Sequence, residues 1–206
     1  VLVILFQPEL RKALEQIGRG AIRERATGSE SAQIVSEITH CMLNLSRRRV
    51  GALIVIEQRI GLKDVVETGT TLNSEISSAL LENIFEPNTP LHDGAVVIRG
   101  NRIMAAACIL TLSEGKGISR ELGTRHRAAI GITETTDAIS LIVSEETGTI
   151  SVAEGGMLKR HLAPGTLEKL LRNALCKNED QAANKSIGAY FKEKFQEGKG
   201  GRHHEE

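Results

Sequence analysis

Apolar positions along this chain alternate between helical and extended spacings. Apolar residues that recur every three or four positions predict amphipathic helices, and continuous or alternating apolar runs predict strands. The helical pattern covers residues 8–17, 29–49, 73–86, 119–130 and 166–175. The extended pattern covers residues 50–56, 94–98, 102–110, 138–143 and 149–153. This mixture predicts a single α/β domain with a central mixed β-sheet flanked by helices.

One strand and two boundaries carry the clearest positional signals. Residues 50–56 are apolar throughout and rich in β-branched side chains, which is typical of a strand covered on both faces, so we expect it at the centre of the sheet. Asn73 is expected to cap the helix that stops before Pro87. The Gly100-Asn101 pair between two strand-like runs predicts a β-hairpin.

Composition narrows the possible functions. The chain has 206 residues, with 26 Lys and Arg against 26 Asp and Glu, and only 2% aromatic residues. Because the chain has no net charge and few aromatic side chains on which bases could stack, we expect no nucleic-acid partner. Cys41, Cys108 and Cys176 are far apart and form no CxxC motif, so they are interpreted as reduced, small core residues.

Two clusters concentrate the residues that can do chemistry. Residues 92–95 read His-Asp-Gly-Ala at the start of a predicted strand, and residues 123–127 read Gly-Thr-Arg-His-Arg. Asp93 could hold a divalent cation or accept a proton from a hydroxyl, and arginines match phosphate oxygens in two-point contacts. The pair predicts a metal-and-phosphate site for nucleotide chemistry. Three successive helical residues span most of a turn, so one member of the Arg-His-Arg triplet is expected to be structural.

A third segment follows the predicted strand of residues 138–143. Its acids, Glu145 and Glu146, either complete a metal site or form a solvated turn. The chain contains no GxxxxGK[ST] loop, so the Gly-Thr-Arg step of residues 123–125, together with Ser144, is the available phosphate cradle.

These segments resemble a known family. The DGA, RHR and SEET motifs of diadenylate cyclases, the enzymes of the DAC domain, resemble residues 87–95, 123–129 and 143–148 in that order. The likeness extends from about Phe6 to Leu162, and residues 6–11 and 51–55 further resemble the membrane-anchored CdaA type. The resemblance implies the DAC fold.

The resemblance also implies a domain organisation. In the CdaA type, transmembrane helices precede the catalytic domain, which would lie at the cytoplasmic face of the cell membrane, with this fragment itself soluble. We therefore expect residues 1–7 to be the remnant that follows a removed anchor, residues 8–165 the catalytic domain, and residues 166–206 a C-terminal helix and polar tail. By pattern alone, Val1–Phe6 could equally be a core strand, and it is too short to cross a bilayer.

The activity that the resemblance implies is condensation of two ATP molecules into cyclic di-AMP with release of two pyrophosphates. It implies a divalent metal, Mn²⁺, Mg²⁺ or Co²⁺, and a homodimer whose two ATP sites face each other. A regulator protein and a phosphoglucosamine mutase are the partners expected for the anchored type.

The motif matches assign roles to individual residues. Asp93 would be the catalytic residue, which deprotonates or metal-activates the ribose 3′-hydroxyl. The implied metal ligands are His92, Asp93 and Glu146. The implied substrate-binding residues are Gly94, Ala95, Ile109, Leu110, Gly123, Thr124, Arg125, His126, Arg127 and Ser144.

One position departs from the family pattern, and two other functions stay open. Ile109 stands where an aromatic residue is frequent, so if it faces adenine it packs without ring stacking. A catalytically silent nucleotide sensor would carry the same motifs. An HD-type phosphohydrolase is suggested by His92-Asp93, but it needs further His and Asp ligands on helices.

Overall fold

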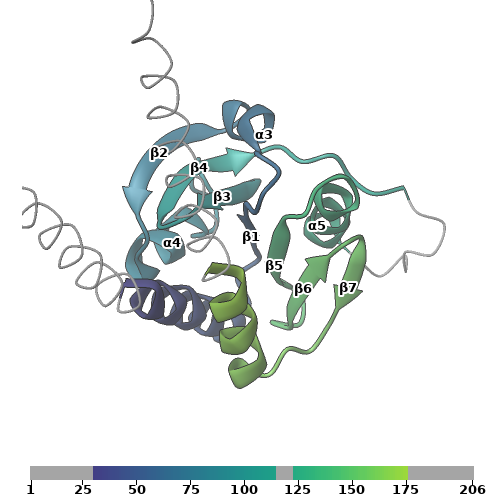
Figure 1. Ribbon diagram of the computed structural model, residues 1–206. Coiled ribbons are helices and arrows are strands. Elements are labelled where there is room, and N and C mark those ends of the chain that lie inside the picture. The colour runs from purple at the N-terminus through teal and green to yellow at the C-terminus, as the bar shows by residue number, and fades with distance from the viewer. Residues whose placement is uncertain (1–29, 115–122, 176–206) are drawn as a thin grey trace, which may run out of the picture.

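The chain folds around one seven-stranded β-sheet, within the part that this computed structural model describes, residues 30–114 and 123–175 (Figure 1). The strands are β1 (Ala52–Ile56), β2 (Thr70–Glu75), β3 (Ala95–Arg99), β4 (Arg102–Cys108), β5 (Ile139–Val143), β6 (Ile150–Glu154) and β7 (Met157–Lys159). The helices are α3 (Lys63–Glu67), α4 (Ser78–Ile84), α5 (Thr124–Thr135) and two further helices at residues 30–48 and 164–175. The predicted helix of residues 8–17, Cys176 and the polar tail lie outside the described residues.

The sheet is mixed and β1 lies at its centre. The strand order is β2-β4-β3-β1-β5-β6-β7, in which β1 runs parallel to β3 and antiparallel to β5. All five residues of β1 are buried, because helices cover both of its faces. The predicted central strand and mixed sheet are confirmed.

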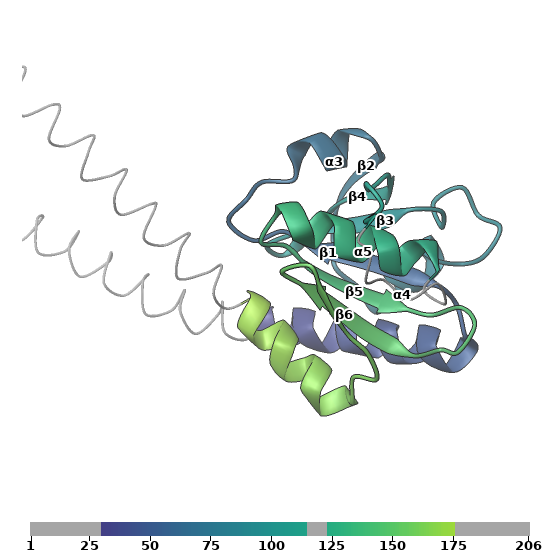
Figure 2. The same ribbon diagram turned by 90° about the vertical axis from the view of Figure 1, so that its right-hand side faces the viewer.

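Helices form a layer on each face of the sheet. Figure 2 shows α5 above the sheet and the helix of residues 30–48 below it. The lower layer, which also contains α4 and the helix of residues 164–175, packs against Ile54 of β1. The upper layer of α5 and α3 packs against Val55, the next residue of the same strand. Alternate residues of β1 therefore fill two separate cores, as the period of a strand requires.

The predicted hairpin is present, since β3 pairs antiparallel with β4 across Gly100-Asn101. The extended runs at residues 138–143 and 149–153 form β5 and β6, which pair antiparallel. The helix predicted at residues 29–49 is observed at residues 30–48, and the one predicted at residues 166–175 at residues 164–175.

Two predicted helix starts are wrong. Asn73 does not cap a helix; it lies within β2 with φ 46° at a register shift, and the N-cap of α4 is Ser77, whose hydroxyl accepts a hydrogen bond from Leu80 N at 3.3 Å. The helix predicted from about Ser119 begins at Thr124, because Gly123 has an extended backbone (φ −64°, ψ 171°).

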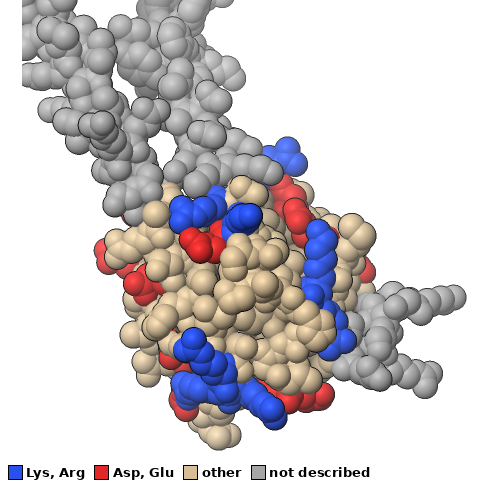
Figure 3. All heavy atoms as spheres, turned by 90° about the horizontal axis from the view of Figure 1, so that it is seen from below, with Lys and Arg blue, Asp and Glu red and all other residues tan. Residues whose placement is uncertain are grey.

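The surface carries charges of both signs. In Figure 3, Lys and Arg lie interspersed with Asp and Glu around a broad uncharged centre, in keeping with the equal totals of the two kinds. Of the helices in the described ranges, none combines the length and the apolar character needed to cross a bilayer.

One edge of the sheet gathers the segments that matter for chemistry. Ala52 of β1 pairs with Val143 of β5, and Ala95 of β3 pairs with Cys108 of β4. β1 and β3 therefore begin, and β4, β5 and β7 end, at the same edge, which we call the pocket edge. The polar residues that precede or follow these strands lie in a row along it.

Candidate active site

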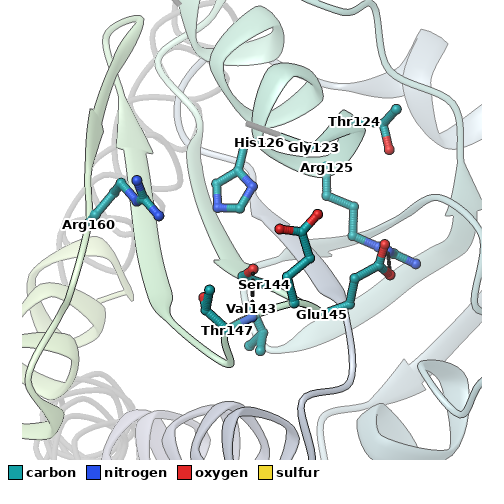
Figure 4. Close-up of a pocket in the computed structure, with 10 residues that line it drawn as sticks. Gly123, Thr124, Arg125, His126, Val143, Ser144, Glu145, Thr147 and Arg160 are labelled. Carbon is teal, nitrogen blue, oxygen red and sulfur yellow. Dashed lines mark hydrogen bonds and ion pairs between the residues drawn. The ribbon is translucent and has the colours of Figure 1, made fainter. Parts of the chain in front are cut away.

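A pocket opens at the pocket edge, between the start of α5 and the strands β5 and β7. Figure 4 shows side chains from these three segments pointing toward one another. The pocket is lined by Gly123, Thr124, Arg125, His126, Val143, Ser144, Glu145, Glu146, Thr147 and Arg160. The structure thus brings together the second and third sequence clusters.

The N-terminus of α5 forms one wall with its backbone exposed. Gly123 is the N-cap and supplies no side chain, and no side chain within residues 30–114 and 123–175 caps the helix. Because the first N–H groups of a helix have no carbonyl partner within it, and the helix dipole is positive at this end, the wall suits an anion. Thr124 adds a hydroxyl at the same place.

The opposite wall is a tight turn between β5 and β6. Gly148 N donates to Ser144 O at 2.8 Å, and Thr147 N donates to Ser144 Oγ at 3.3 Å. Ser46 Oγ donates to Gly148 O at 2.6 Å, which ties the turn to the helix of residues 30–48. Gly148 has φ +73°, and a Cβ there would lie 2.4 Å from Ser46 O, so glycine is required.

An ion pair connects the two walls. Arg125 Nη1 lies 2.6 Å from Glu145 Oε2, with the arginine side chain 20% exposed and the carboxylate 65% exposed. A Cβ at Gly51, just before β1, would stand 2.6 Å from that nitrogen and 2.8 Å from that oxygen. The absence of a side chain at Gly51 is therefore what leaves room for the pair.

His126 is the buried polar group of the pocket. It is 6% exposed, and its Nε2 has no hydrogen-bond partner among the residues that the structure describes. Burial, reinforced by the positive charge of Arg160 and opposed by Glu146, lowers the pKa of His126 below its ordinary value. The imidazole is therefore neutral near pH 7, and its ring nitrogen is available to a ligand.

Arg127 does not line the pocket but bonds to the segment that follows β4. Its Nε and Nη2 both donate to Ser113 O at 3.2 Å, while Ser113 N donates to Arg127 O at 3.0 Å. These bonds hold the segment after β4 against α5. The Arg-His-Arg triplet is thus divided, with Arg125 and His126 in the pocket and Arg127 outside its lining.

The first sequence cluster lies at the pocket edge without lining the pocket. Asp93 is exposed just before β3, and His92 Nδ1 lies 2.6 Å from Thr89 O. Gly94 has φ +124°, and a Cβ there would lie 2.7 Å from Ala107 C, so this glycine permits the close approach of β4. Ala95 is 1% exposed and paired with Cys108, so it contributes to the core.

Ile109 and Leu110 follow β4 at the same edge. Ile109 is 72% exposed, with its backbone N donating to Thr68 Oγ1 at 2.9 Å. Leu110 is half-buried and packs on the upper core. An exposed isoleucine in a fixed backbone position provides an apolar surface at the Asp93 side of the row.

The proposed metal ligands do not converge within this chain. Among residues 30–114 and 123–175, no three His, Cys, Asp or Glu side chains lie together as a metal centre would need. A Mg²⁺ ion typically takes one or two carboxylates from a protein and obtains its remaining ligands from substrate phosphates and water.

Sequence reasoning missed three contributors to this site. Arg160, just after β7, and Thr147 line the pocket, and Gly51 makes space for its ion pair. A single Arg after a short strand belongs to no recognisable motif. A glycine before a strand gives no sign in the sequence of the side chains that lie next to it. The pairing of β1 with β5 and of β6 with β7 brings Gly51 and Arg160 close to Ser144, whereas Thr147 lies on the same turn as Ser144.

Comparison with known proteins gives consistent relatives. A family model described as DAC, DisA bacterial checkpoint controller nucleotide-binding, matches residues 39–158. The cyclic di-AMP synthase CdaA of Bacillus subtilis (strain 168) is 52% identical over 188 residues, which are 89% of this chain and 69% of that protein. A diadenylate cyclase of Listeria monocytogenes serotype 1/2a (strain 10403S) is 50% identical over 177 residues, 84% and 65% of the two chains. The chain thus spans about two thirds of these relatives' lengths.

Solved structures agree with the sequence relatives. The crystal structure of a cysteine double mutant of DacA from Staphylococcus aureus has a TM-score of 0.69 and 48% identity, covering 69% of this chain and 95% of that one. A structure from Bacillus cereus, described as a hypothetical membrane spanning protein, has a TM-score of 0.60 and 50% identity, covering 62% and 63%. The likeness is one of sequence and fold together.

Proposed function

This chain belongs to the DAC family, the DisA bacterial checkpoint controller nucleotide-binding domains, and from that membership we propose that it is a diadenylate cyclase, which joins two ATP molecules into cyclic di-AMP and releases two pyrophosphates. The observation that carries this proposal is the pocket, where an uncapped helix N-terminus, the guanidinium of Arg125 and Ser144 face one space. Backbone N–H groups, a hydroxyl and a guanidinium are donors that phosphate oxygens accept.

Asp93 is the residue that we assign to proton removal. Its carboxylate is exposed and has no hydrogen bond within the described residues, so it is free to accept the proton of a ribose 3′-hydroxyl. As that proton leaves, the 3′-oxygen forms a bond to the α-phosphorus of the other ATP. The bond from that phosphorus to the bridging oxygen breaks, and pyrophosphate departs with the electron pair. The same step in the opposite direction closes the ring.

The separation of the acid from the phosphate pocket within one chain supports the participation of two protomers. Asp93 precedes β3 and Ser144 follows β5, with β1 between them, so their backbones are separated by two strand spacings, roughly 10 Å. Asp93 also does not line the pocket. The arrangement supports a face-to-face homodimer in which Asp93 of each protomer acts on the ATP bound by its partner.

Within each pocket, the task of the protein is alignment and charge neutralisation. Thr124, Arg125 and Ser144 would hold phosphate oxygens, and His126 would offer a neutral ring nitrogen. Ile109 would contact the base through its exposed side chain.

A divalent metal belongs to the proposal. His92, Asp93 and Glu146 would hold it in part, with the phosphates of ATP as further ligands, and when bound it neutralises negative charge on the transferred phosphoryl group. Which of Mn²⁺, Mg²⁺ and Co²⁺ serves best is measured by activity with each metal after treatment with a chelator.

A membrane anchor and protein partners complete the proposal. The likeness to the Bacillus cereus protein described as membrane spanning supports an anchor in the full-length protein, with this domain at the cytoplasmic face. A regulator protein and a phosphoglucosamine mutase are proposed partners on family resemblance alone, and co-purification with the full-length protein tests both.

Incubation of the chain with ATP and Mn²⁺, followed by detection of cyclic di-AMP, tests the activity. Asp93→Asn is expected to abolish product while ATP affinity stays within about twofold, because the amide cannot accept the proton but preserves the shape of the side chain. If the unaltered chain binds ATP and the ATP is recovered intact, the result would favour a catalytically silent nucleotide sensor. Full activity in the variant would remove Asp93 from the mechanism.

A further inference from the structure

Arg160 is the cation of the pocket that has no partner. It follows β7, lines the pocket, and makes no ion pair or hydrogen bond within residues 30–114 and 123–175. In Figure 4 its guanidinium points toward His126 from the side opposite Arg125. An exposed arginine adds little to the stability of the fold, so the donors of Arg160 are free to bind an anion in the pocket.

The other two arginines of the site already have contacts. Arg125 pairs with Glu145 through Nη1 at 2.6 Å, while its buried Nε has no partner among the described residues, and Arg127 donates two hydrogen bonds to Ser113 O. Arg160 is therefore the guanidinium of the described site whose five donors are all available to an incoming anion. A fork of donors of this kind matches terminal phosphate oxygens in two-point contacts.

A second group in the pocket also lacks a partner. His126 Nε2 is buried without a hydrogen bond, and the residue lies between Arg125 and Arg160 in Figure 4. A buried polar atom left without a bond is costly, so its position indicates that a ligand completes it. The uncapped N-terminus of α5 adjoins the same space.

The order of residues along the pocket edge indicates which part of ATP each one meets. The strand order places the exposed Ile109 after β4, the Ser144 turn after β5, and Arg160 after β7. A nucleotide whose base lies at Ile109 and whose first phosphate lies at the start of α5 extends its remaining phosphates toward β7.

We propose that Arg160 binds the β- and γ-phosphates of ATP, together with His126, and so forms the subsite of the pyrophosphate leaving group. This assignment rests on the proposed function and adds the substrate part that Arg160 recognises. When the bond between the α-phosphorus and the bridging oxygen breaks, the electron pair and negative charge pass to the pyrophosphate. A guanidinium that binds the pyrophosphate stabilises this charge as it develops, without a proton transfer.

Binding of magnesium pyrophosphate, ATP and AMP, measured by calorimetry, tests the assignment. Arg160→Ala is expected to weaken binding of pyrophosphate and ATP about tenfold or more, because charge-assisted hydrogen bonds are lost, and to change AMP affinity less than about twofold. Arg160→Lys should recover part of the loss, since it keeps the charge without the fork. Lys159→Ala is the matched control, as the neighbouring cation is exposed and does not line the pocket.

Three results would overturn the assignment: equal pyrophosphate affinity in the Arg160→Ala chain and the unaltered chain, an equal loss for AMP, or no measurable pyrophosphate binding by the unaltered chain. Failure of the proposed function would look different. In that case the unaltered chain makes no cyclic di-AMP, while the comparison of pyrophosphate affinities still decides the role of Arg160.

Discussion

At the scale of single residues, Gly51 controls the geometry of Arg125. An added methyl group would lie 2.6 Å from Arg125 Nη1, which is the far end of a flexible side chain and can move. Gly51→Ala is therefore expected to fold, with Tm within a few degrees of the parent, but to raise KM for ATP several-fold because the guanidinium is displaced. Steady-state kinetics and thermal unfolding separate the two effects.

Gly61→Ala is the control for that substitution. A Cβ at Gly61 has no atom within 4 Å, so kinetics should be unchanged. An unaltered KM in Gly51→Ala would show that Arg125 does not need its observed position to hold ATP.

Ile109 is the residue expected to limit affinity for the base. Its side chain is 72% exposed at the pocket edge but has no π-face for adenine. Ile109→Tyr should tighten ATP binding several-fold, since stacking of a base on an aromatic ring is worth about 1–3 kcal/mol. Ile60→Tyr changes another exposed isoleucine, beyond the opposite end of β1, and should have no effect. Equal ATP affinity in both variants would count against contact of Ile109 with adenine.

At the scale of elements, the turn between β5 and β6 depends on Gly148. This residue combines φ +73° with a predicted clash of a Cβ against Ser46 O at 2.4 Å. Gly148→Ala should lower the free energy of unfolding by about 1–3 kcal/mol and also weaken ATP binding, because the Ser144 turn would separate from the helix of residues 30–48.

Gly155→Ala separates the two causes. It also has a positive φ, 57°, but a Cβ there meets no atom within 4 Å, so it reports the backbone cost alone. Denaturant unfolding of both variants measures the difference. Equal losses would mean that contact with Ser46 contributes nothing to the turn.

The elements predicted correctly are those whose own residues determine them. β1 was predictable because every residue is apolar, and the hairpin of β3 and β4 because Gly100-Asn101 is a turn signal. β2 was missed because it is a polar edge strand: five of its six residues, all except Leu72, are polar, so the strand shows no apolar alternation. α3 has only five residues, too few for a helical period.

The same reasoning explains how much of the site was predictable. Asp93, Arg125 and Ser144 stand in motifs, so their clusters were visible in the sequence. Gly51 and Arg160 act through space, across strands that are distant in the chain, and no local pattern marks them. The division of the triplet between pocket and loop likewise depends on where Ser113 lies after β4.

At the scale of the whole molecule, the proposed dimer predicts a diagnostic intermediate. In a mixed dimer of unaltered chain and Asp93→Asn chain, only one of the two attacks retains its proton acceptor. An excess of the variant is therefore expected to yield a linear dinucleotide, joined once and still carrying a triphosphate, at the expense of cyclic di-AMP. Mass spectrometry of the products measures both species.

Dilution of the unaltered chain with Gly61→Ala is the matching control, since that variant keeps Asp93 and should preserve the cyclic product. Cyclic di-AMP that merely falls in proportion to the unaltered chain, without a linear species, would indicate that each protomer completes both steps by itself.

The ion pair between Arg125 and Glu145 also means that an incoming anion must compete with Glu145 for the guanidinium. Glu145 sits on the same short turn as Ser144, so its carboxylate is tethered beside the guanidinium at a high effective concentration and cannot diffuse away. A guest with one negative oxygen gains little by replacing it, whereas a polyphosphate offers several oxygens at once. Glu145 is therefore a competitor for anions within the pocket, and we expect the pocket to favour polyphosphates over solutes with one negative oxygen.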